Sequence, residues 1–408
     1  MPTPTSEVIP PKLLGERLQQ ARKACGLTQH DVAEKLGMVR TTLVAIEKGE
    51  RKLQPAELVD MAKLYGRAPG DFVGRRANVQ PFVPQFRLPP GEEGVSEAEV
   101  ISCATELEAL AEDYALLERI NGRPTRSTFP PVYSLDVPGT TPDHLGEDVA
   151  SAERTRLGLG DAPIPDLRAL LEESMGIRVF YVDLPQRVGG LFACNDELGA
   201  CIAINRKHPP QRGNWSLAHE YGHFLTTRYQ ADVDLVHGAW GKNAAERFAD
   251  AFAKNFLMPR SGVTRRLSES VQAHGKGVTI ADVMAMAALF RVSAEAMFRR
   301  LEELKRLPFG KWEELKKRGF RPEQARRSLG LANPISPQPM LPLRFRLLAK
   351  NAYEDRAEIT EGQLAKMLRT DRVSARLELE RLSLLVDSAG DDGYEPVDLP
   401  DLSEPVVS

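Results

Sequence analysis

Apolar residues recur at intervals of three and four in the first part of the chain, a spacing that predicts short amphipathic helices. Four helices are expected, over residues 13–26, 29–36, 40–47 and 55–65. Thr28 is a good N-cap for the second of them, and Pro55 suits the first turn of the fourth. The second and third are joined by a tight turn, so this segment is predicted to form a helix-turn-helix.

The middle of the chain changes to short apolar runs separated by turns. These runs predict three strands, at 179–182, 190–193 and 201–204. Helical spacing returns in the segment 243–257, where phenylalanines recur every four residues and Pro259 ends the helix. Residues 121–145 are rich in proline and predicted to be irregular, whereas further helices are expected over 101–120, 165–175, 278–291 and 293–306.

The last part of the chain is predicted to be helical over 341–353 and 360–385. The stretch 359–380 has the shape of a second small helix-turn-helix, made basic on one side by Arg369, Arg372, Arg376 and Arg381. Such a unit can touch DNA, but we favour a structural or partner-binding role. Residues 387–408 hold seven acids and no Lys or Arg, so this tail is predicted to be disordered. It could mask a basic groove or add solubility.

Length and composition indicate a soluble protein of two to three domains. The 408 residues carry a net charge of −3 and are 42% hydrophobic. No stretch is apolar enough to span a membrane, and the first residues lack the features of a signal peptide. The four cysteines show no C-x-x-C spacing, which favours reduced thiols and a cytoplasmic location.

The most informative residues follow the predicted strands, in the segment 215–225. His219, Glu220 and His223 form the H-E-x-x-H pattern of zinc metallopeptidases. On a helix the two histidines are one turn apart, so both imidazoles can reach one metal ion. Glu220 can hold a water molecule near that metal, and the small Gly222 lets another segment approach. A chance match is the competing interpretation of a single such pattern.

A zinc hydrolase needs a third protein ligand and an open position for water or substrate. Glu246 and Asp250 are four residues apart on the next predicted helix, so they share one face. Glu246 is the candidate third ligand. Asp250 is the candidate acceptor for the free ring N–H of a zinc histidine, with His219 favoured. The alternative is a solvated pair of acids on an amphipathic helix.

The residue types define a hydrolytic mechanism. A Zn2+ ion lowers the pKa of bound water and polarises the scissile carbonyl. Glu220 is predicted to take a proton from the water and to pass it to the leaving amine. Spacing does not fix the residues that stabilise the oxyanion or bind substrate, and the candidates by proximity are His237, Tyr229 and Tyr221. For His237 a surface or structural role is the alternative.

The segment from about 150 to 260 resembles the ImmA/IrrE family of metallopeptidases, which are often fused to DNA-binding domains. Trp215–Phe224 and Glu246–Pro259, a helix that ends in Leu-Met-Pro, carry this resemblance. The resemblance implies zinc, with Glu220 as catalytic base and with the ligands His219, His223 and Glu246. It also implies a narrow substrate, usually a repressor protein, and control by stress, DNA damage or mobile elements. Single-stranded DNA is a candidate activator.

The N-terminal helices resemble the XRE/Cro-repressor family of DNA-binding domains over about 12 to 73. Residues 27–37 and 46–55 carry the resemblance. It implies that the third helix enters the major groove of double-stranded DNA, that Gln29 contacts a phosphate or a base, and that the base-facing residues are Arg40, Thr41, Thr42 and Ala45. One departure is Val39, which stands where members usually have a Ser or Thr cap.

The charge of the N-terminal segment is compatible with DNA but modest. Residues 1–76 contain thirteen Lys and Arg and nine Asp and Glu, a net charge of +4. Neutralisation of phosphates dominates DNA affinity, so a larger surplus of positive charge would have indicated DNA binding more clearly. The alternative is a small helical domain used for protein contacts or for forming a homodimer.

Together these patterns predict a multidomain, mainly α protein with an α+β zincin-like peptidase core and an N-terminal all-α helix-turn-helix domain. The expected order is a DNA-binding domain at 1–76, a linker at 77–100, the peptidase domain at 101–306, a helical region at 307–386 and an acidic tail at 387–408. The favoured function is a DNA-binding regulatory zinc endopeptidase. The alternatives are a transcriptional regulator whose peptidase-like domain only senses metal, ligand or partner, and a phage-related repressor.

Overall fold

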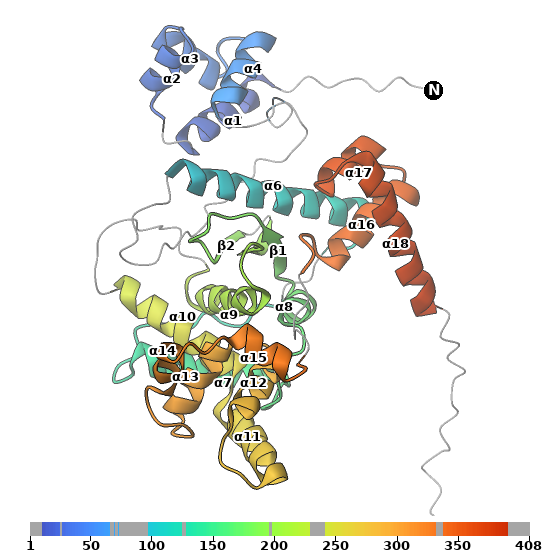
Figure 1. Ribbon diagram of the computed structural model, residues 1–408. Helices are drawn as coiled ribbons and strands as arrows, with labels where there is room; N and C mark the ends of the chain where they lie inside the picture. The colour runs from blue at the N-terminus through green and yellow to red at the C-terminus, as the bar shows by residue number, and fades with distance from the viewer. Residues whose placement is uncertain are drawn as a thin grey trace, which may run out of the picture. The chain divides into compact units, whose positions relative to one another are not determined.

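The computed structural model describes residues 10–24, 27–65, 69, 72, 97–124, 128–195, 198–228, 241–331 and 338–390. Helices dominate, and the described strands form one three-stranded sheet (Figure 1). The predicted fold class, mainly α with a small α+β core, is confirmed. The chain divides into two compact units, formed by 1–112 with 126–340 and by 113–125 with 341–408.

The N-terminal domain of the first unit has the four expected helices, α1 (Pro11–Ala24), α2 (Gln29–Lys35), α3 (Arg40–Glu47) and α4 (Pro55–Leu64). They enclose a core of their own, built from residues such as Leu18, Val32, Leu43 and Met61. The predicted cap of α2 is present, because the Thr28 hydroxyl accepts a hydrogen bond from the Asp31 amide. The shared core therefore stabilises these short helices, and α2 is also stabilised by its capped end.

The sheet consists of β1 (Arg178–Val182), β2 (Gly190–Asn195) and β3 (Gly199–Asn205), in the order β1-β3-β2. β1 runs parallel to β3, and β2 runs antiparallel to it. Among the described strands β2 pairs with β3 alone, so its other side is a sheet edge. All three strands were predicted. Before them, α8 (Leu167–Met175) ends at Gly176, which adopts the left-handed conformation that a helix end requires.

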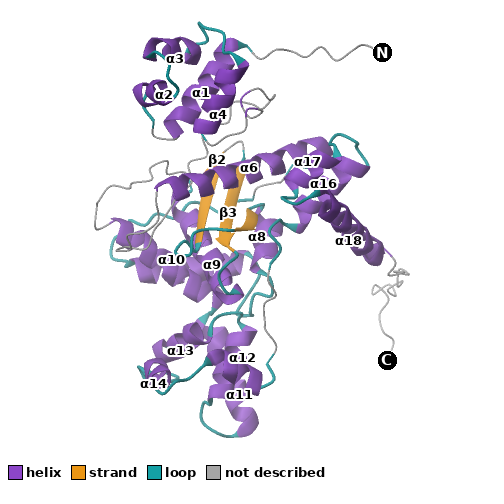
Figure 2. Ribbon diagram, turned by 45° about the horizontal axis from the view of Figure 1, so that its top comes forward, coloured by secondary structure: helices purple, strands orange, loops and turns teal. Residues whose placement is uncertain are grey.

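Helix α9 (Pro210–Thr227) follows β3 and packs on β2 and β3. It also contacts α10 (Gly241–Leu257), which packs in turn against α7 (Pro142–Arg156). Figure 2 shows α9 beside the sheet and α10 beside α9. Gly146 permits the close approach of α7, because a Cβ there would lie 2.7 Å from the Phe248 carbonyl oxygen. The segment expected to be irregular up to residue 145 therefore already becomes helical at Pro142.

Five further helices complete this part of the chain, α11 (Arg260–His274), α12 (Ile280–Leu289), α13 (Ala294–Glu303), α14 (Lys311–Lys317) and α15 (Pro322–Ser328). Trp312 and Leu315 of α14 belong to the same hydrophobic core as the α9 and α10 side chains. The packed body therefore extends past the predicted boundary at 306. Cys103, Cys194 and Cys201 form no disulfide bond within the described part of the chain. Within the described residues, no helix combines the length and apolarity that crossing a bilayer requires.

The second unit combines the end of α6 (Glu97–Asn121) with α16 (Leu343–Glu354), α17 (Glu361–Met367) and α18 (Arg372–Gly390). The Tyr114 and Phe345 rings meet edge to face, with centroids 5.3 Å apart. The Asn121 side-chain amide donates to the Leu348 carbonyl at 3.0 Å. Residues of α6 from 113 onward therefore pack with the C-terminal helices rather than with the predicted peptidase domain.

Two predicted boundaries shift at helix ends. α6 begins at Glu97, inside the predicted linker, and α18 continues to Gly390, so residues 387–390 of the predicted tail are helical. The rest of the linker, like the tail from 391 onward, lies outside the described residues.

Candidate metal centre and DNA-binding helix

The two histidines of the H-E-x-x-H pattern lie one turn apart on α9 and point the same way. Their Nε2 atoms are 3.0 Å apart, and the ring planes are inclined at 80°. His223 is buried and His219 is partly exposed. The helix is held in place by its apolar side, where Leu217, Phe224 and Leu225 enter the core. This packing fixes the direction of both imidazoles.

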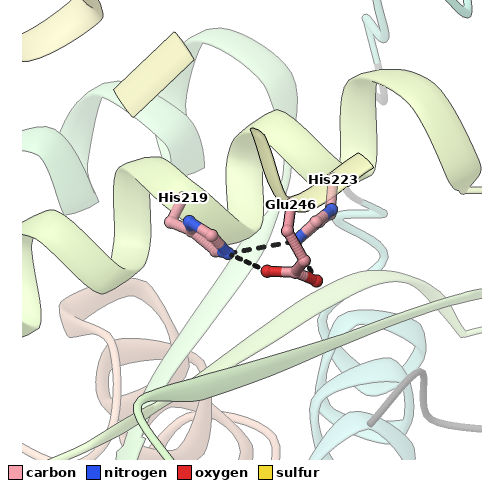
Figure 3. A group of neighbouring side chains, drawn as sticks. All are labelled: His219, His223 and Glu246. Carbon is pink, nitrogen blue, oxygen red and sulfur yellow. Dashed lines mark hydrogen bonds and ion pairs between the residues drawn. The ribbon is translucent and has the colours of Figure 1, made fainter. Parts of the chain in front are cut away.

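Gly222 lets α10 approach this helix closely, as the sequence suggested. A Cβ at Gly222 would lie 3.1 Å from the Ala249 Cα and 3.2 Å from the Phe252 ring. At this separation Glu246 of α10 extends to both imidazoles (Figure 3). Its carboxylate oxygens lie 3.3 Å from His219 Nε2 and 3.4 Å from His223 Nε2.

The three side chains fit a zinc ion by donor type and by spacing. Two imidazole nitrogens and one carboxylate oxygen lie within 4.8 Å of one another. Ligands at zinc bond lengths of about 2.0–2.2 Å in a tetrahedral site are separated by roughly 3.3–3.6 Å. The two Nε2 atoms are 3.0 Å apart, and the two Glu246 oxygens lie 3.3 Å from His219 Nε2 and 3.4 Å from His223 Nε2, which is close to that range. Three protein donors leave a fourth position for water or substrate.

Asp250 makes the predicted contact with the outer ring nitrogen of His219. Its Oδ1 lies 2.9 Å from Nδ1 of that ring. An N–H on Nδ1 leaves the Nε2 lone pair directed toward His223 and Glu246. The carboxylate of Asp250 therefore orients the imidazole and selects the tautomer that can bind a metal.

Negative charge is concentrated around these imidazoles. Burial opposes protonation of His219, but hydrogen bonds with Asp250 and Glu246 and the charge of Glu220 raise the pKa of His219 to about 10. Burial also opposes the charge of Glu246, yet the two histidines hold the pKa of Glu246 well below its ordinary value. A metal ion would have to displace protons from this site, so its affinity is expected to fall as the pH falls.

The Glu220 side chain lies against the first residue of β2. A Cβ at Gly190 would come within 2.9 Å of the Glu220 Cγ, and a Cβ at Gly189 within 2.8 Å of the Ser216 hydroxyl. The pair Gly189–Gly190 thus lets the edge strand approach two successive turns of α9. Sequence reasoning missed this contact, although two adjacent glycines at the start of a predicted strand are the signal that could have indicated it.

Tyr221 does not belong to the site, which corrects its prediction as an oxyanion or substrate residue. It is fully buried, and its hydroxyl donates to Glu153 at 2.5 Å. Arg156 pairs with the same carboxylate at 2.7 Å. Two residues along a helix correspond to a rotation of about 200°, so Tyr221 faces away from His219. The other two candidates, Tyr229 and His237, lie outside the described residues.

The helix proposed for the major groove presents the predicted side to solvent. Leu43, Ile46 and Glu47 point into the N-terminal domain. Arg40 and Thr41 are exposed, and Thr42 and Ala45 are half-buried. No side chain caps α3, because Val39 occupies the N-cap and is 68% exposed. The departure noted in the sequence therefore leaves the amides at this helix start without a side-chain acceptor.

Gln29 is engaged inside the domain. Its amide nitrogen donates to Glu47 at 2.9 Å, and Arg22 donates to the other oxygen of that carboxylate at 2.6 Å. Burial opposes the Glu47 charge, but the bonds from Arg22 and Gln29 keep the pKa of Glu47 below its ordinary value. Gln29, which was predicted to contact a phosphate or a base, thus already donates to a buried carboxylate that joins α1, α2 and α3.

Two families match parts of the chain. Residues 13–72 match the family described as helix-turn-helix domain, and residues 172–302 match the family described as IrrE N-terminal-like domain. Among curated proteins none matches. One aligned solved structure is that of PlcR from Bacillus thuringiensis in complex with a peptide and DNA. It is 11% identical over 93% of this chain and 96% of that chain, with a TM-score of 0.18, which does not indicate a shared fold. The chain therefore joins a helix-turn-helix domain to an IrrE N-terminal-like domain.

Proposed function

We propose that the protein is a DNA-binding regulatory zinc endopeptidase that cuts one specific protein, a transcriptional repressor. The convergence of His219, His223 and Glu246 beside Glu220 carries this proposal. A helix-turn-helix domain in the same chain supports a regulatory purpose, since it would bring the peptidase to a promoter or to a DNA-bound target. The same proposal includes stress, DNA damage or mobile elements as the trigger and single-stranded DNA as an activator. It also includes a homodimer and a cytoplasmic location.

Each residue of the site has a distinct role in this mechanism. His219, His223 and Glu246 would hold the metal. When bound, zinc makes water acidic and stabilises negative charge on the scissile carbonyl oxygen. Glu220 accepts a proton from the attacking water and returns it to the leaving amine. Asp250 keeps His219 in the tautomer that binds metal.

The edge of β2 provides a place for an extended substrate. β2 pairs only with β3 among the described strands, and its first residue touches Glu220. A peptide can add to such an edge through main-chain hydrogen bonds, which would align its scissile bond with the metal site. A segment that is already unfolded or loosely held in the target protein would fit this geometry better than a helix.

The test compares wild type with Glu220→Gln and with the control Glu173→Gln, which changes an exposed acid on α8. Zinc content is measured together with cleavage of repressors encoded near the gene. Zinc should remain bound in all three proteins, while cleavage should fall at least a thousandfold in Glu220→Gln only, because the base is removed. Cleavage by Glu220→Gln at the wild-type rate, or a wild type that binds no metal, would contradict the proposal. Zinc binding without any cleavage would favour the sensor alternative.

A further inference from the structure

A polar cavity of about 360 Å³ lies beside the first turn of α9. Its walls come from the start of α8, from the segments after β1 and β3, and from the loop that follows α12. None of the three candidate metal ligands lines it. A volume of this size is within the range of small-molecule sites.

Positive charge predominates in the walls. The lining contains four Lys and Arg residues and two Asp, which are Arg168, Arg206, Lys207, Arg291, Asp166 and Asp183. Both acids are already engaged. Asp183 accepts two hydrogen bonds from Arg206, at 2.9 and 2.6 Å, and Asp166 caps α8 by accepting from the Ala169 amide. Arg168 pairs with Glu172, just outside the lining, at 3.2 Å, so among the described residues Arg291 is the cation of the lining that no carboxylate pairs with.

Two donors in the walls have no hydrogen-bond partner among the described residues. Within the described ranges, no residue forms a hydrogen bond or ion pair with the Arg291 guanidinium. The same holds for the Tyr181 hydroxyl, although Tyr181 is only 8% exposed. Burial raises the pKa of Tyr181 to about 12, so the hydroxyl keeps its proton and can donate.

The surrounding contacts fix the Tyr181 ring and the backbone at Arg291. The Arg168 guanidinium lies 5.2 Å from the centre of the Tyr181 ring, and it is itself fixed by the carbonyl of Val179 at 2.7 Å. Asn214, in the first turns of α9, donates to the Arg291 carbonyl at 3.1 Å. The backbone of the Arg291 loop is therefore tied to α9, the same helix that carries the histidines.

We propose that this cavity binds a small organic anion, whose carboxylate or phosphate group is held by the Arg291 guanidinium and the Tyr181 hydroxyl. The planar guanidinium can donate two parallel hydrogen bonds to either group. The phenol supplies a third donor, and Leu167 and Pro210 give the rest of the ligand an apolar surface. This site needs neither a metal nor Glu220, so it stands apart from the peptidase proposal.

The test is a titration of the full chain with inorganic phosphate in one arm and acetate in the other, at constant ionic strength, followed by tryptophan fluorescence. Each arm is run with the zinc-loaded protein and after chelation, because an anion could also bind to zinc. We expect at least one anion to bind saturably, with the same dissociation constant in both forms. The arm that saturates identifies the anionic group.

Three variants test whether the anion binds in this cavity. Arg291 has a φ of 56°, which favours glycine, so Arg291→Gly should fold at least as well as wild type and yet bind at least tenfold more weakly. Tyr181→Phe should weaken binding about threefold to tenfold. Arg299→Gln, which removes an exposed arginine paired with Glu295 and Glu313, should change nothing. The proposal is overturned if neither anion saturates, if chelation abolishes binding, or if Arg291→Gly binds like wild type.

Discussion

At the scale of single residues, the candidate site depends on small glycines as much as on charged side chains. Gly222 brings Glu246 to the histidines, and Gly190 sets the distance between the edge strand and Glu220. The histidines, Glu246 and Asp250 could all be predicted from motif and helical spacing. The contact of Gly190 could not, because it joins a strand and a helix whose packing no local pattern encodes. Tyr221 was predicted to belong to the site because it is close to His219 in sequence. Its side chain instead leaves the helix on the opposite side, and this direction decides its environment.

Gly190→Ala should reduce cleavage at least tenfold and leave zinc content unchanged. The added methyl group would meet the Glu220 Cγ and the Ile204 Cδ1, both at 2.9 Å, so the general base must move while the metal ligands stay. Cleavage rate and zinc content are measured together. The control is Gly277→Ala, since a Cβ there meets no atom within 4 Å. Equal activity of the two variants would show that Gly190 does not position Glu220.

Glu172 gives the peptidase-like part a pH-dependent stability. Burial raises the pKa of Glu172 to about 7, although Arg168 and the Val179 amide partly oppose this. The folded state therefore keeps a proton that the unfolded chain has lost above about pH 4.3. Stability should decrease as the pH rises from about 4.5 to 7, by about 1–3 kcal/mol, and this loss persists above pH 7.

Glu172→Gln should remove this decrease, whereas Glu173→Gln, its exposed neighbour, should retain it. Urea unfolding at several pH values measures the effect. Tryptophan fluorescence is the suitable probe, because all three tryptophans, Trp215, Trp240 and Trp312, belong to this half of the chain. If the free energy of unfolding had the same pH dependence in wild type and Glu172→Gln, the pKa of the Glu172 carboxyl would not be raised.

At the scale of elements, strong local sequence patterns predicted helices and strands correctly, whereas weak patterns did not predict how helices pack. The three strands and the helices of the N-terminal domain lie where apolar runs and caps predicted them. The principal partner of α10, α7, was not foreseen. The buried side of α7 consists of Gly146, Val149, Ala150, Glu153 and Arg154, so α7 lacks the large apolar stripe that identifies an amphipathic helix. Close packing with α10 stabilises it instead, a property of the tertiary structure.

One substitution should stabilise the start of α3. Val39→Thr would place a hydroxyl at an N-cap that has no side-chain acceptor, and should stabilise the helix by about 1 kcal/mol. Amide hydrogen exchange of residues 40–47 should slow about fivefold. Val59→Thr is the matched control, because Val59 is exposed inside α4 rather than at a helix end. Unchanged exchange in Val39→Thr would mean that the cap is satisfied in another way.

At the scale of the whole molecule, the two domains were predictable, and the extent of the units was not. Motifs identified the helix-turn-helix domain and the IrrE N-terminal-like domain. No motif indicates that α6 continues from one compact unit into the other, or that Trp312 completes the core that contains the metal-site helices. Such limits depend on contacts between segments far apart in sequence.

The central claim is that His219, His223 and Glu246 bind zinc. Anomalous diffraction at the zinc edge, on crystals of the full chain, tests it most directly. We expect one zinc ion at about 2.0–2.2 Å from both Nε2 atoms and a Glu246 oxygen. In Glu246→Gln the anomalous peak should be lost or much weaker. No zinc peak between these three side chains in zinc-loaded wild-type crystals, or a peak only elsewhere, would contradict the account.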